Sequence, residues 1–166
     1  MEKQLRNKGA WDKLTELAES IKICMLCTTD ISGNMRSRPM VVLDVDENGD
    51  LWFFANRLSD LCLELGEEGL VCLSFSHPAK DEFLSVSGHA VIIRDKIKNK
   101  ELWSSMLKTW FPNGHNDPEL ILIRVSPSTA SYWDNDVSKM VELFSYLKAA
   151  VTGRKYAEGE HGQLEL

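Results

Sequence analysis

Long apolar runs are missing from this sequence. No stretch of its 166 residues approaches the roughly 20 apolar residues that a membrane-spanning helix needs. The first residues, MEKQLRNKGAWDKL, are charged from position 2 and hold no apolar segment of the kind found in secretory signals. We therefore expect a cytoplasmic location and no membrane partner. In that compartment the four cysteines are expected to be reduced.

An excess of positive charge is missing as well. The chain has 19 Lys and Arg against 25 Asp and Glu, whereas nucleic-acid binding needs a basic field over one face. Nucleic acid is therefore not an expected partner. The 43% hydrophobic content is enough to form a core, and no repeat or linker divides the chain. We expect one domain over residues 1–166, with a core over about 10–151 and a polar tail over 152–166.

Little in the sequence indicates side-chain catalysis or a bound metal. There is no GxSxG turn, and the four histidines stand singly, without a second ligand at the spacings of zinc sites. Cys24 and Cys27 have CxxC spacing, but they fall in a predicted strand, where residues three apart face opposite sides. We interpret these thiols as structural, assign no catalytic residue and predict no metal site.

Apolar periodicity predicts strands in hairpin order, with helices at the start, the middle and the end. Helices are expected over 10–21, 58–65, 96–107 and 137 to about 151; strands are expected over 22–29, 34–45, the first part of 51–60, 70–76, 82–95 and 120–134, the last divided at Ser126-Pro127. The segment 22–29 is expected to form a hairpin with 34–45 across the turn DISGN, and 34–45 is expected to pair with 51–60 across the turn DENGD. This order does not alternate strand with helix, so an antiparallel barrel with flanking helices is predicted.

The most informative segment is MRSRPM. Strand alternation places Arg36, Arg38 and Met40 on one side, and Pro39 and Val41 on the other. Arginines beside apolar groups suit an anionic ligand with a flat apolar body, because a guanidinium can bind a phosphate through two hydrogen bonds. A purely structural interpretation stays open, in which proline and arginine protect an edge strand from further pairing.

The second informative segment is LWFFANRLSD. At least two of its aromatic residues, Trp52, Phe53 and Phe54, are expected to be core residues. The chain then passes from the end of a strand into a predicted helix that Ser59 caps. Backbone N–H groups, the Ser59 hydroxyl and Arg57 could gather around an anion at that point.

Several ordered motifs resemble one known family. From about Leu14 to the C-terminus, the chain is similar to the FMN-binding split-barrel flavoproteins, and among them to the general stress protein group related to pyridoxamine 5'-phosphate oxidase. The motifs are MLCTT, RSRPM, LWFFA, LSVSGHA, WFPNGHNDPEL and SYWD. The resemblance implies a mainly β protein, a six-stranded antiparallel split β-barrel of Greek-key type. It also implies a homodimer with FMN at the subunit interface.

Residue pattern and resemblance together define a set of candidate cofactor-binding residues. The resemblance places flavin contacts in the strand with RSRPM, after LWFFA, near Ser59, and in the loop 110–116 of the partner subunit. The candidate set is Arg36, Arg38, Pro39, Met40, Val41, Phe53, Phe54, Ala55, Asn56, Arg57, Ser59 and Trp110.

Two positions depart from what the family commonly carries. Ala55 stands where relatives have a threonine, and Leu61 where they have a lysine; both missing groups would contact the FMN phosphate. We predict an FMN-binding flavoprotein, an oxidoreductase with unknown donor and acceptor. The alternative is a flavin-poor or flavin-free binding module of the stress response. Vitamin B6 phosphate oxidation is not expected, because 146–166 lacks the basic, histidine-containing sequence that holds that substrate. Haem and deazaflavin are less favoured ligands.

Overall fold

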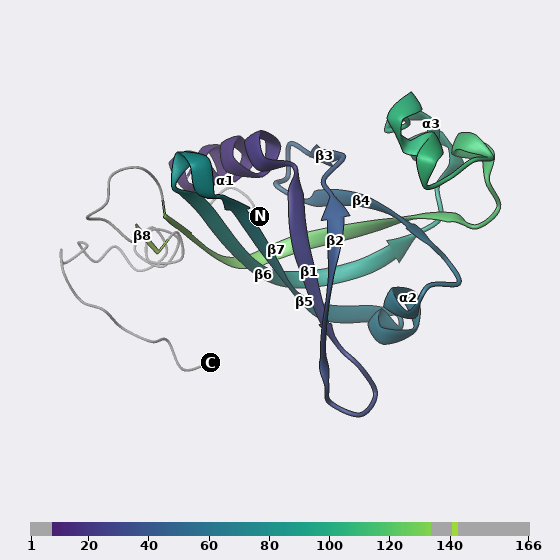
Figure 1. The fold of residues 1–166 in the computed structure, drawn as a ribbon, viewed down its shortest axis with the longest axis horizontal. Helices are drawn as coiled ribbons and strands as arrows, with labels where there is room; N and C mark the ends of the chain where they lie inside the picture. The colour runs from purple at the N-terminus through teal and green to yellow at the C-terminus, as the bar shows by residue number, and fades with distance from the viewer. Residues whose placement is uncertain (1–7, 134–140, 143–166) are drawn as a thin grey trace.

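The computed structural model describes residues 8–133 and 141–142 (Figure 1). Its helices are α1 (Lys8–Ile21), α2 (Asp60–Leu65) and α3 (Lys96–Glu101), with short 3-10 turns η2 (Pro78–Lys80), η3 (Ser105–Thr109) and η4 (Gly114–Asn116). Its strands are β1 (Ile23–Thr29), β2 (Met35–Val41), β3 (Asp44–Val45), β4 (Leu51–Asn56), β5 (Glu68–His77), β6 (Glu82–Ile93), β7 (Leu120–Trp133) and β8 (Val141–Glu142). The described part is thus mainly β with flanking helices, as predicted.

All strand pairs are antiparallel and form one sheet in the order β2-β1-β5-β6-β7-β4-β3, with β8 paired to β7. The expected count of six is therefore wrong, because seven strands follow the path of the sheet and β8 pairs beside it. The additions, β3 and β8, have two residues each. Strands this short carry no periodic pattern that a sequence could reveal.

The sheet curls because the chain crosses directly from one of its edges to the other. The Val42 N–H donates to Lys22 O, next to β1, and the following N–H, that of Leu43, donates to Trp52 O of β4. Edge strands β2 and β3 must therefore lie close together at this point. Figure 1 shows the β1–β2 hairpin crossing in front of β6 and β7. The result is a curled antiparallel sheet, a half-barrel that resembles a split barrel.

Four sequence predictions need correction. The pairing expected between 34–45 and β4 across DENGD is limited to the two residues of β3, while β2 pairs with β1. β7 does not divide at Pro127. It is one continuous strand in which Pro127 pairs with Gly88 and a bulge follows, where the register shifts between Ser87 and Gly88. The helix expected over 96–107 ends at Glu101. Residues 141–142 of the expected C-terminal helix form β8; the rest of that helix and the tail lie outside the described residues.

The core has two parts, one on each side of β4. Inside the curled sheet, the α1 residues Leu14, Leu17 and Ala18 pack with residues of most strands. They recur at helical spacing, which confirms the amphipathic helix predicted over 10–21. On the outside, Trp52 and Phe54 pack under the segment from α3 to η4. Both faces of β4 are therefore covered.

Candidate functional site

Strand β2 has two unlike faces, as its alternation predicted. Arg36, Arg38 and Met40 are opposed to Thr28, Leu26 and Cys24 of β1, which are buried. Pro39 is exposed on the other face and Val41 is half-buried there. Among the described strands, β2 pairs with β1 alone, so the outer row of its backbone groups is an unpaired sheet edge. The structural interpretation of MRSRPM as an edge strand is thus confirmed, and it does not conflict with ligand binding.

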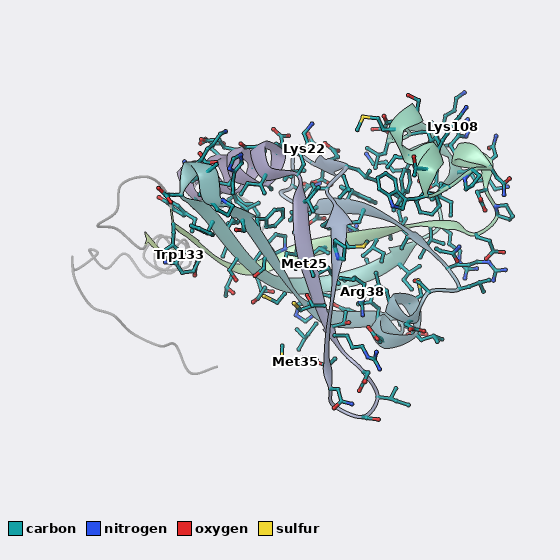
Figure 2. The ribbon with its side chains drawn as sticks, viewed as in Figure 1. Lys22, Met25, Met35, Arg38, Lys108 and Trp133 are labelled. Carbon is teal, nitrogen blue, oxygen red and sulfur yellow. The ribbon has the colours of Figure 1, made fainter. Side chains whose placement is uncertain are left out.

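Arg38 joins β2 to α2 through a closed network. Its Nη2 donates to Glu64 Oε2 at 2.6 Å, and its Nη1 donates to Thr28 Oγ1 at 2.9 Å. The Thr28 hydroxyl in turn donates to the same Glu64 oxygen. The Arg38 side chain is 22% exposed and that of Glu64 only 7%. This partly buried ion pair holds β2 against the helix after Ser59, the two segments that stand out in the sequence. Figure 2 shows Arg38 between β2 and α2.

Glu64 remains a carboxylate although it is buried. The hydrogen bond from Thr28 and the hydrogen bonds and charge of Arg38 lower its pKa below the ordinary glutamate value. Arg36 is a weaker partner, because its Nε lies 3.9 Å from Glu64 Oε1 and donates to Asp30 Oδ2 at 3.3 Å. Its side chain is 57% exposed. Arg38 is therefore fixed, whereas Arg36 can reorient at little cost.

The turn before α2 is ordered by its own polar groups. Asn56 Oδ1 accepts from the Leu58 N–H at 2.8 Å, and Asn56 O accepts from the Ser59 N–H at 3.0 Å. Ser59 stands at the N-cap position, but its side chain makes no capping bond and contacts only the Cys62 sulfur, at 3.6 Å. Its hydroxyl is therefore available to a ligand. Arg57 is engaged elsewhere, with Nη2 at 3.0 Å and Nε at 2.9 Å from the two Glu119 oxygens.

The remaining candidates are mostly core residues. Phe53 and Ala55 lie in the inner cluster and Phe54 in the outer one, so Trp52 and both phenylalanines are all buried. Leu61 is also buried in the inner cluster. The Leu61 side chain therefore packs in the core and offers no donor to a phosphate. Trp110 is exposed, while its neighbour Phe111 packs edge-on against Phe54.

The structure therefore assembles part of the candidate set. Arg36, Arg38 and Met40 lie on one face of β2, and Arg38 contacts the helix that Ser59 begins. Sequence reasoning missed the acidic partners Asp30, Glu64 and Glu119. One signal could have revealed Glu64: with Leu61 and Leu65 it has the spacing of one helix face, so a carboxylate stands on the buried side of α2.

Other kinds of site receive no support in the part of the chain that the structure describes. Residues 8–133 and 141–142 contain no group of three or more histidine, cysteine and acidic side chains that could hold a metal. None of the described helices is long and apolar enough to cross a membrane. A small hollow between α1 and residues 127–130 includes none of the candidate cofactor-binding residues.

The polar groups around β2 and the turn before α2 fit the flavin ring of FMN better than they fit its phosphate. An unpaired strand edge beside apolar side chains suits a flat heterocycle, because backbone groups can meet its polar rim. Three arginines could bind an anion, but each is already paired with a carboxylate. A phosphate dianion would therefore have to displace a carboxylate. These arginines can bind the FMN phosphate only if it replaces a carboxylate as their partner. Arg36 is the arginine best placed to change partner in this way.

Comparison with known proteins agrees with the fold. Over 151 residues the chain is 27% identical to protein bli-3 of Neurospora crassa, covering 85% of this chain and 72% of that protein. A general stress FMN/FAD binding protein of Xanthomonas citri superposes with a TM-score of 0.67 at 28% identity, covering 81% of this chain and 95% of that one. A Clostridium acetobutylicum protein related to general stress protein 26 superposes with a TM-score of 0.68 at 23% identity, covering 82% of this chain and 94% of that one.

The half-barrel with its flanking helices thus defines the class of fold, one that resembles a split barrel and that the chain shares with these two structures. Within that class, the family described as "Pyridoxamine 5'-phosphate oxidase like" matches residues 9–157. The chain belongs to this family, as its motifs predicted.

Proposed function

We propose that this protein is a homodimeric flavoprotein that binds FMN without a covalent bond and serves as an oxidoreductase with donor and acceptor still unidentified. Membership of the family supports a flavin, and so does the name of the Xanthomonas citri neighbour, a general stress FMN/FAD binding protein. The observation that carries the proposal is the contact of Arg38 with α2, which brings the basic strand to the turn that ends at Ser59. A cytoplasmic location and the absence of a nucleic-acid partner stay predictions from the sequence.

Bound FMN would supply the electron-transfer chemistry, and the chain would supply binding and orientation. The free backbone edge of β2 and the apolar side chains of Pro39 and Met40 would hold the ring. The Ser59 hydroxyl and the reoriented Arg36 would bind the phosphate, with Arg38 and Glu64 keeping β2 and α2 in place. No side chain of this set needs to act as an acid or base.

The homodimer is supported by a surface on which apolar and small polar side chains predominate, with the exposed Glu68–His89 pair near the start of β5 as an ionic contact. We call it the outer face: it comprises the outward side chains of β1, β2 and β5 with those of the β6 and β7 ends that α3 leaves uncovered. Its exposed large apolar members are Ile23, Met25, Met35, Leu70, Phe83 and Trp133, and serine, threonine, cysteine and proline fill most of the space between them. Apolar surface of this kind is typical of protein interfaces. A second copy of this chain is the partner that we propose.

The first experiment is an absorption spectrum of the freshly purified full chain, followed by titration of FMN against its fluorescence. We expect a flavin spectrum or saturable quenching. A colourless protein that leaves FMN fluorescence unchanged would refute the cofactor. Riboflavin, titrated in parallel, measures how much of the affinity depends on the phosphate.

The dimer has a separate test, light scattering at micromolar concentration. Met25→Lys places a charge on the outer face and should yield a monomer. Leu63→Lys is the matched control, because Leu63 is an apolar residue of α2 that is 76% exposed and not part of the outer face. A monomeric unsubstituted protein, or equal effects of both substitutions, would contradict this interface.

A flavin-poor binding module remains the second candidate. The observation that favours it is the pairing of all three candidate arginines with carboxylates, together with burial of Ala55 and Leu61 where phosphate donors were expected. One hydrogen bond to a charged group contributes about 1.5–3 kcal/mol, so the loss of one would weaken FMN roughly tenfold to a hundredfold. FMN quenching that saturates only at millimolar concentration, with a stable dimer, would favour this candidate.

A further inference from the structure

Two cysteines on neighbouring strands face each other. Cys27 of β1 and Cys72 of β5 are directly opposed in the antiparallel register, and opposed residues of such a pair project from the same face of the sheet. Both are partly exposed on the outer face, and both are free thiols. Two residues far apart in the sequence therefore form one dithiol site.

The pair stands where two hairpins separate. The β1–β5 register ends at Cys27 and Cys72, whereas β1 continues alongside β2 and β5 continues alongside β6. One residue further along β1, Thr28 contacts Glu64 and Arg38 on the inner side. A bond between the two sulfurs would cross-link the hairpins at the last residue pair that they share, next to the candidate flavin site.

Only weak contacts hold the two thiols. Cys27 Sγ donates to Ser37 Oγ of β2 at 3.3 Å, and Cys72 Sγ lies 3.8 Å from Ser85 Oγ of β6. The serines lie on opposite sides of the pair, so side-chain rotation must bring the sulfurs together. Opposed Cβ atoms in such a sheet are about 4.5–5.5 Å apart, close to the roughly 3.5–4.5 Å of disulfides. A bridge here needs a small adjustment and is expected to be reducible.

The other two cysteines lack this arrangement. Cys24 is buried on the inner side of β1, and burial raises the pKa of its thiol to about 12, which makes it a poor nucleophile. Cys62 lies on α2 and donates to the Asn56 carbonyl at 3.4 Å. They serve as internal controls for the opposed pair.

We propose that Cys27 and Cys72 form a redox site, a dithiol that hydrogen peroxide converts to a disulfide within one chain. One sulfur, as thiolate, attacks the peroxide; the O–O bond breaks, one water leaves and a sulfenic acid forms. The second thiol then attacks that sulfur, and the S–S bond forms as a second water leaves. Two thiols lose two electrons to one peroxide and give one disulfide and two waters. The proposal does not depend on the proposed flavin, and it concerns the dissociated chain, because the proposed dimer would cover both thiols.

The reduced full chain, diluted until light scattering gives the mass of a monomer, is treated with limiting hydrogen peroxide, and the products are mapped by peptide mass spectrometry. We expect the loss of two hydrogens per chain, a cross-link between the peptides of Cys27 and Cys72, and reversal by dithiothreitol. Cys27→Ser and Cys72→Ser should each abolish the cross-link. Cys62→Ser, the matched control, should retain it at the yield of the unsubstituted protein.

A second measurement uses the unsubstituted protein, so that it does not depend on how the serine variants fold. Phenylarsine oxide bridges two neighbouring thiols; one equivalent should bind to the reduced chain, and prior oxidation should block it. A bridge to Cys24 or Cys62, a bridge between two chains on a non-reducing gel, or sulfinic acids without a cross-link would each overturn the proposal.

Discussion

Strands β4 and β2 carry the two segments that stand out in the sequence, and the structure treats them in opposite ways. In β4 every residue from Leu51 to Ala55 is buried, because the inner cluster covers one face and the segment from α3 to η4 covers the other. β2 is an edge strand with no fully buried residue. Apolar runs without alternation thus indicate cover on both sides, whereas arginines between apolar residues indicate an edge.

The two strands also differ in what they contribute to stability and to ligand binding. The aromatic residues of β4 contribute mainly through burial, which is largely insensitive to a ligand. The arginines of β2 contribute through ion pairs, which a ligand can replace. Substitutions in β4 should therefore change the free energy of unfolding, and substitutions around β2 should change both stability and affinity.

The largest effect is expected in β4. Phe53→Ala leaves a cavity at a fully buried position and should lower the free energy of unfolding by about 3–5 kcal/mol, measured by urea denaturation. Met35→Ala, at a position of β2 that is 79% exposed in the single chain, should change the free energy of unfolding of the monomer by no more than about 0.5 kcal/mol. Similar losses for both would break the contrast between the two strands.

A smaller loss is expected where β2 meets α2. Arg38→Met keeps the aliphatic stem but leaves the buried Glu64 carboxylate with Thr28 and the distant Arg36, at a cost of about 1–3 kcal/mol. Arg57→Met is the matched control, because its ion pair with Glu119 is more exposed and should contribute at most about 1 kcal/mol. Urea denaturation of both variants gives the order, and the reverse order would contradict the role of Arg38.

The affinity for FMN should increase when Glu64 loses its charge. Glu64→Gln keeps the hydrogen-bonding shape but removes the charge that neutralises Arg38, so FMN should bind roughly tenfold more tightly, or ~1.4 kcal/mol, by fluorescence titration. Riboflavin, which lacks the phosphate, should gain nothing, and the exposed Glu67→Gln should have no effect on either ligand. An equal gain for riboflavin would mean that Glu64 does not act on the phosphate.

The smallest effect is a pH dependence at the same carboxylate. The pKa of Glu64 is lowered in the folded chain. At pH values just below the ordinary glutamate pKa, the unfolded chain therefore binds more protons than the folded chain, and stability rises with pH in that range. The stability difference between the unsubstituted chain and Glu64→Gln should be full near neutral pH and fade as the pH falls through the folded pKa. Parallel urea curves at several pH values measure it; a constant difference would contradict the linkage.

Much of this protein could be predicted from particular residues. The apolar spacing of Leu14, Leu17 and Ala18 indicated α1, and the alternation of MRSRPM indicated the two faces of β2. Motif order indicated the family. The turn DISGN indicated the hairpin of β1 with β2. How little of 34–45 pairs with β4 across DENGD could not be predicted, because a turn reports only a change of direction. The carboxylates beside the arginines were missed because Glu64 and Glu119 come from other elements.

The sequence by itself determined the class of fold, the faces of each long strand and the family, because these depend on periodicity and on residue order along the chain. Tertiary structure alone decided which charges meet. It placed Glu64 against Arg38, buried Leu61 where a phosphate donor was expected, and set Cys27 opposite Cys72. Ion pairs and opposed thiols depend on distances of a few ångströms between distant segments, and only strand pairing and the packing of α2 against the sheet set those distances.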